Sequence, residues 1–71
     1  MYQEVFLIHQ SKMENLMELL PQYSAIYLGN TSLLPNATRL KFPIKEVSEL
    51  FAAKLLELGI ISIRQYNRKM Q

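Results

Sequence analysis

The sequence predicts a small α+β fold, a four-stranded antiparallel sheet with two helices on one face, in the order β-α-β-β-α-β. Two observations lead to this prediction. Short runs rich in apolar and β-branched residues are separated by two longer stretches in which apolar residues recur at helical spacing. Gly29-Asn30 and Gly59 follow apolar segments and mark places where the chain turns. These segments account for almost all of residues 1–71, so we expect a single domain.

The first half of the chain predicts a strand, a helix and a second strand. Residues 2–8 form the first strand, whose last four residues are apolar on both faces, as in a central strand covered on both sides. Ser11 and Glu14 have the spacing of a capping box, which predicts a helix from residue 13. Pro21 ends that helix, because proline has no amide hydrogen and blocks the helical conformation of the preceding turn. Residues 24–28 form the second strand.

The second half begins with a strand and a helix that are easier to predict. Apolar and basic residues alternate over residues 38–44, which is typical of a strand with one face in water. Residues 45–58 then carry a broad apolar stripe at helical spacing. Gly59 is expected to end this helix in the left-handed conformation, and Ile60 would supply the apolar contact of a Schellman motif.

The C-terminal segment, residues 60–71, allows two interpretations. As a fourth strand it directs Ile61 and Ile63 toward the core, beside the first strand. As a helix it is capped by Ser62, and the chain then reads β-α-β-β followed by a C-terminal helical hairpin. We predict the strand, because four of its first seven residues favour β structure and because Arg64 in a first helical turn would oppose the helix dipole. With that strand the order resembles the ferredoxin-like superfold, which hosts many functions and implies none.

Composition excludes several classes of function. The chain has no cysteine, so disulfides and thiolate metal sites are excluded, and it has no aspartate, which excludes EF-hand calcium loops. Two glycines cannot build a phosphate-binding loop, and no apolar run is long enough to cross a membrane. His9, the single histidine, has no partner for a catalytic or metal role in the sequence. We therefore expect a cytoplasmic protein that is not an enzyme and needs no metal or cofactor.

The apolar excess predicts protein–protein contacts. Hydrophobic residues make up 49% of the chain, yet a chain of this length buries only about 60% of its unfolded surface. The first strand would present apolar side chains to the open face of the sheet, and burial against a second copy would cover them. We therefore expect a small interaction or regulatory protein that forms a homodimer. The candidate contact residues are Phe6, Leu7, Leu33 and Leu34.

The basic residues support an alternative function, a nucleic-acid-binding module that uses a basic sheet face. The net charge of +2 is modest, but basic and aromatic side chains would share that face in the four-stranded fold. Phe6 has a position similar to the first aromatic motif of RNA-recognition sheets, whereas the second such motif is absent. An ordinary solvated strand face would explain the same pattern. The candidate contact residues for nucleic acid or another partner are Arg39, Lys41, Arg64, Tyr66, Arg68 and Lys69.

Overall fold

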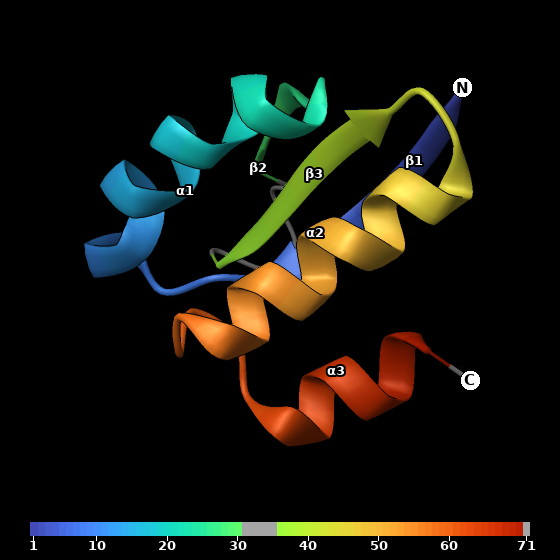
Figure 1. Ribbon diagram of the computed structural model, residues 1–71. Helices are drawn as coiled ribbons and strands as arrows, with labels where there is room; N and C mark the ends of the chain where they lie inside the picture. Colours follow the sequence, from blue (N-terminus) through green and yellow to red (C-terminus); the bar gives the residue numbers. More distant parts are fainter. Residues whose placement is uncertain (31–35, 71) are drawn as a thin grey trace.

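The computed structural model describes residues 1–30 and 36–70, and the described part is α+β (Figure 1). Two short 3₁₀ turns flank the first helix, and the three strands form one antiparallel sheet in the order β1-β3-β2. The predicted sheet of four strands with two helices is therefore wrong: the described residues form three strands and three α-helices. These elements are β1 (Tyr2–Leu7), α1 (Met13–Leu19), β2 (Ile26–Asn30), β3 (Ala37–Phe42), α2 (Lys45–Glu57) and α3 (Ile63–Lys69).

The correction concerns the C-terminal segment, which is the helix α3 and not a fourth strand. Ser62 is extended and caps the helix, since its hydroxyl accepts a hydrogen bond of 3.2 Å from the Gln65 amide. Arg64 does lie in the unfavourable first turn, but Arg68 and Lys69 occupy the last turn, where cations stabilise the helix dipole. Arginine, glutamine and lysine are also good helix formers. The helical interpretation that the sequence had left open is the one that the structure shows.

The end of α2 confirms the predicted Schellman motif. Gly59 has a φ of +73°, which only glycine adopts without strain. The amide of Ile60 donates to the carbonyl of Leu55 (2.8 Å), and the amide of Gly59 donates to that of Leu56 (3.1 Å). Ile60 itself is buried in the core. After this turn the chain continues for only a few residues before α3 begins at Ile63.

The loss of the fourth strand also changes the position of β1. Its two-faced apolar sequence predicted a central strand, but β3 is central, and β1 and β2 both pair with it. In β1, Phe6 is fully buried whereas Val5 and Leu7 are 40% and 47% exposed. Only one face of β1 is therefore covered by the protein core, and the other faces solvent.

The core lies between one face of the sheet and the helices α1 and α2, which lie on the same side of it (Figure 1). Phe51 of α2 is at its centre, with ring centroids 5.9 Å from Phe6, 5.3 Å from Phe42 and 5.2 Å from Tyr23. Such edge-on and tilted ring pairs add to the stabilisation that burial provides. The buried cluster consists of Phe6, Ile8, Leu16, Leu19, Leu20, Leu40, Phe42, Phe51, Ala52, Leu55, Ile60 and Ile61.

The predicted capping box at the start of α1 does not form. Ser11 lies inside a 3₁₀ turn, Gln10–Lys12, and Lys12 precedes the helix without a side-chain capping bond. His9 caps the 3₁₀ turn instead, because its Nδ1 accepts a hydrogen bond of 3.2 Å from the Ser11 amide. The histidine singled out by the sequence thus has a local structural role at a turn.

Candidate functional site

Helix α3 lies along the free edge of β1 and bonds to it through side chains. The Lys69 ammonium donates to the carbonyl of Val5 and, at 2.9 Å, to the carboxylate of Glu4. The Gln65 amide group lies against the backbone of Leu7. With its oxygen and nitrogen assigned from these neighbours, the nitrogen donates to the Leu7 carbonyl (3.1 Å) and the oxygen accepts from the Leu7 amide (2.5 Å). These bonds provide hydrogen-bond partners for backbone groups of Val5 and Leu7. In the predicted four-stranded sheet, the backbone of the fourth strand would have been their partner. The Val5–Leu7 part of the β1 edge is therefore covered, which hinders pairing of this edge with other chains.

The contact between Lys69 and Glu4 is the strongest electrostatic feature of this edge. Burial alone would raise the pKa of Glu4, but hydrogen bonds from Lys69 and Tyr2 and the Lys69 charge outweigh it, so the pKa lies below its ordinary value. The Tyr2 hydroxyl donates to Glu4 at 2.8 Å, and this bond raises the pKa of Tyr2. Lys69 also lies over the ring of Phe6, 4.5 Å from its centroid. One ammonium thus connects α3 to both the edge and the core.

The lowered pKa of Glu4 predicts a pH-dependent contribution to stability. Above the ordinary glutamate pKa of 4.5, Glu4→Gln should reduce the free energy of unfolding by about 1–2 kcal/mol, because a charge-assisted contact is lost. As pH falls below that value, the unfolded chain binds the proton first, so the wild-type advantage declines and disappears below the folded pKa. Urea unfolding of both proteins between about pH 7 and pH 2.5 measures this difference. A difference that stays constant over this range would contradict the lowered pKa.

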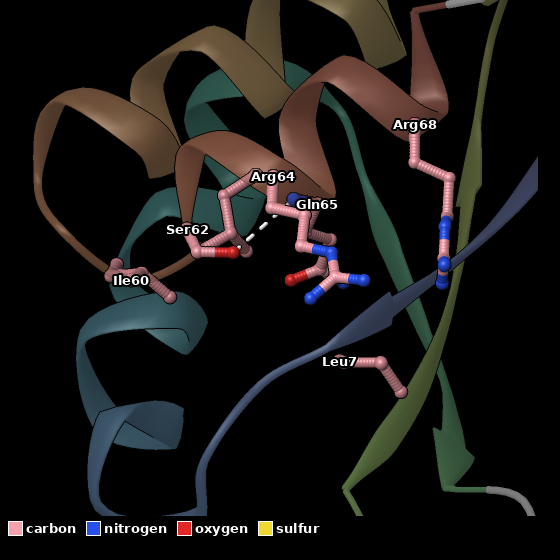
Figure 2. Close-up of a pocket in the computed structure, with 7 residues that line it drawn as sticks. Leu7, Ile60, Ser62, Arg64, Gln65 and Arg68 are labelled. Atoms are coloured by element: carbon pink, nitrogen blue, oxygen red, sulfur yellow. Dashed lines mark hydrogen bonds between the residues drawn. The ribbon is translucent and has the colours of Figure 1, made fainter.

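A hollow of about 560 Å³ opens between α3 and the end of β1 (Figure 2). Arg64 and Arg68, one helical turn apart, extend from α3 toward β1, and Leu7 lies across the hollow from them. Within the described part of the chain, neither guanidinium forms a hydrogen bond or an ion pair. The hollow therefore combines apolar walls with two cations whose donors are available. Its lining residues are Leu7, Ile60, Ile61, Ser62, Arg64, Gln65 and Arg68.

The second candidate surface is the open face of the sheet, defined as the side chains that point away from the helices. Side chains alternate along a strand and directly paired residues share a face, so the register places the members of this set. Arg39 lies opposite Val5, and its guanidinium donates to the Leu28 carbonyl (3.1 Å). Ile26, opposite Lys41, is 49% exposed. The open face consists of Gln3, Val5, Leu7, Ile26, Ala37, Arg39 and Lys41, of which Ala37 is buried.

Charge is distributed unevenly between the two sides of the molecule. The layer of α1, α2 and the turn before α1 carries five glutamates and three lysines, a net charge of −2. The open face and the hollow together carry four cations, whereas the described strands place no carboxylate on the open face. Lys69 and Glu4 neutralise each other at the edge. The open face and the hollow thus carry four positive charges against a net charge of −2 on the helical layer, and together they give the chain its net charge of +2. The four cations are Arg39, Lys41, Arg64 and Arg68.

The predicted basic site divides among three places in the structure. Arg39 and Lys41 lie on the open face, as the alternation of β3 predicted. Arg64 and Arg68 line the hollow, Lys69 is bound at the β1 edge, and Tyr66 packs against the core. Tyr66 therefore does not provide an aromatic surface beside the arginines. The fourth strand, which was predicted to bring Arg64 and Tyr66 to the same face as Arg39 and Lys41, is absent from the described fold.

The candidate dimer contacts, like the basic residues, do not lie together on one surface of the described structure. Phe6 is fully buried among the core rings, which leaves Leu7 as the member of that pair that faces solvent. Leu33 and Leu34 lie outside the described residues. Sequence reasoning missed Ile26 and Gln65. The i, i+4 spacing of Gln65 and Lys69 places both on one side of a helix, but this signal appears only when the segment is interpreted as helical.

Other features of the described residues do not add a site of defined chemistry. A second hollow of about 310 Å³ is lined by Gln22, Tyr23, Ser24, Pro43, Val47 and Leu50. No group of three or more His, Cys, Asp or Glu side chains could hold a metal ion in the regions 1–30 and 36–70. Over the same two regions, no helix has the length and apolar character needed to cross a membrane. Comparisons with protein-family models, with curated proteins and with solved structures found no match.

Proposed function

We propose that this chain is a non-enzymatic protein-binding module whose contact surface is the open face of its sheet. One observation carries the proposal: Val5, Leu7 and Ile26 are each at least 40% exposed on a sheet face that α1 and α2 do not cover. Val5 and Leu7 lie on β1 and Ile26 lies on β2, with the cations of β3 between them. Exposed apolar side chains on an uncovered sheet face favour an interaction site. Cations beside them would supply specificity and faster association.

The charge of this face favours a partner with acidic side chains over a second copy of the chain. In a two-fold dimer the same patch meets itself, so Arg39 and Lys41 of both copies would enter one interface in which the described strands place no carboxylate. Like charges brought together in an interface cost energy and suppress the wrong partner. A partner surface that alternates acidic and aliphatic side chains would match both the cations and the apolar residues. The homodimer that the sequence predicted is therefore the competing occupant of the same face.

The same four cations favour a second candidate function, contact with the phosphate backbone of a nucleic acid. Single-strand binders also stack bases on aromatic side chains, but Phe6 is buried and Tyr66 packs on the core. Binding would therefore depend on phosphate contacts alone and would be strongly weakened by salt. Four contacts limit the slope of log affinity against log salt to about −3. An oligonucleotide titration at several salt concentrations tests this function directly.

Selection of peptides from a random displayed library tests the acidic-partner proposal. We expect the immobilised wild-type chain to enrich peptides in which aspartate or glutamate alternates with aliphatic residues. Arg39→Gln/Lys41→Gln should weaken binding of the selected peptides about tenfold, the effect of two rim charges of moderate strength. Lys12→Gln/Lys45→Gln is the matched control, since it removes two exposed cations from the helical side.

Two results would contradict this proposal. Selected peptides without acidic enrichment, or with equal affinity for both double variants, would show that the open-face cations do not recognise the partner. Light scattering at about 100 µM protein shows whether the chain is a monomer or a homodimer, and so tests whether a second copy of the chain occupies the open face. A wild-type dimer that Leu7→Lys converts to monomer would identify a second copy of the chain on this face.

A further inference from the structure

The hollow beside α3 shares Leu7 with the open face but has a chemical character of its own. Two of its polar side chains already have partners within the protein and are less able to bind a ligand. The Ser62 hydroxyl accepts a hydrogen bond from the backbone amide of Gln65, and the Gln65 side chain bonds to the backbone of Leu7. The donors that remain are the guanidinium groups of Arg64 and Arg68. The hollow therefore offers cationic donors and no free carboxylate among its lining residues.

The two arginines project in the same direction from consecutive turns of α3 (Figure 2). A guanidinium presents parallel N–H groups that match the two oxygens of a carboxylate, and it is less strongly hydrated than an ammonium group. Leu7 provides exposed apolar surface across the hollow from these donors, whereas Ile60 lies beside Ser62 and is buried. A ligand that satisfies both parts of the hollow has a carboxylate group on an aliphatic body.

We infer that the hollow between α3 and β1 is a binding subsite for a carboxylate attached to an aliphatic body, recognised by Arg64 and Arg68. The carboxylate has two possible sources, a free aliphatic acid or the C-terminal carboxylate of a protein partner. Both present the same chemistry to the arginines. The volume of about 560 Å³ is in the range of small-molecule sites and accommodates either one. The subsite shares Leu7 with the open face, but the two arginines that recognise the carboxylate lie outside that face.

Titration of the full chain, followed by NMR of the Leu7 methyl and arginine side-chain resonances, tests the subsite. The probes are sodium hexanoate, hexanol, sodium acetate and the tripeptide acetyl-Ala-Leu-Leu with a free or an amidated C-terminus. We expect hexanoate to shift these resonances saturably and to bind at least tenfold more tightly than hexanol or acetate. Arg64→Gln/Arg68→Gln should weaken hexanoate at least tenfold, whereas Lys12→Gln/Lys45→Gln should leave it unchanged. Both variants are first shown to fold by their amide spectra.

The outcomes distinguish the sources and can overturn the inference. Tighter binding of the free-acid tripeptide than of hexanoate, lost on amidation, identifies a partner's C-terminus as the ligand. Equal or tighter binding of hexanoate identifies a free acid. Equal affinity for acetate and hexanoate, equal affinity for hexanol and hexanoate, or absence of saturable shifts below about 10 mM would each overturn the subsite. None of these results depends on the peptides selected by the open face, so the two proposals fail separately.

Discussion

Phe51→Ala should lower the free energy of unfolding by about 3–5 kcal/mol, the usual cost of removing a buried phenylalanine. Phe51 is fully buried and its ring contacts those of Phe6, Phe42 and Tyr23, which come from three different elements. Its removal leaves a cavity where the sheet meets the helical layer. A domain of this size is only marginally stable, so the loss is a large part of the total.

Thermal and urea unfolding, followed by circular dichroism, measure this loss. The midpoint temperature should fall by at least about 12 °C, because each kcal/mol corresponds to several degrees in a domain of this length. Leu50→Ala is the matched control, since Leu50 is the preceding residue of the same helix but is 63% exposed. It should change stability by no more than about 0.5 kcal/mol. Similar losses in both variants would contradict the position of the core given by the structure.

The contrast between these neighbours also shows where sequence periodicity succeeds. The spacing of apolar residues predicted a helix over residues 45–58, one residue longer than the observed α2, and its apolar stripe correctly put Phe51 and Leu55 on the buried face. The same stripe included Leu50 and Leu58, which are exposed. Periodicity predicts a broad apolar face, but the width that is covered depends on the tertiary partners of the helix. One covered sheet face is too narrow to bury the whole stripe of α2.

The C-terminal segment shows why local sequence could not settle the fold. Ile61 favours a strand and is buried as predicted, but it belongs to the bend between α2 and α3. Ile63, expected in the core, is 58% exposed because the helix begins there. The balance between strand and helix depends on contacts with β1 that are distant in sequence, such as Lys69 with Glu4. Propensity alone does not contain this information, since tertiary contacts override weak local preferences.

The candidate site was predictable only in part for the same reason. Alternation along β3 correctly gave Arg39 and Lys41 a shared face, because a strand fixes side-chain direction at every second residue. Arg64 and Arg68 reach the end of β1 only because a helix brings consecutive turns to one side. A fourth strand would have spaced them differently. The hollow is thus a consequence of the element that the sequence left ambiguous.

Gln65→Ala/Lys69→Ala should uncover the edge of β1 and cause the chain to associate. These two side chains bond to the backbone of Val5 and Leu7, where a fourth strand would otherwise pair. Their loss removes several hydrogen bonds, each worth about 1 kcal/mol, and should lower the free energy of unfolding by about 2–4 kcal/mol. It also exposes unpaired backbone groups next to Leu7, and such an edge pairs with other chains.

Two measurements separate this edge effect from a general loss of stability. The Leu7 amide should exchange its hydrogen with solvent faster in the variant, because its acceptor on Gln65 is gone, while amides between β1 and β3 remain protected. Light scattering should show association that increases with protein concentration. Asn67→Ala, an exposed change on the same helix, should show neither effect. Unchanged Leu7 exchange in the double variant would mean that α3 does not cover this edge in solution. Faster exchange without association would show that the uncovered edge of β1 does not pair with other chains, because the strand is short, and would contradict the predicted association.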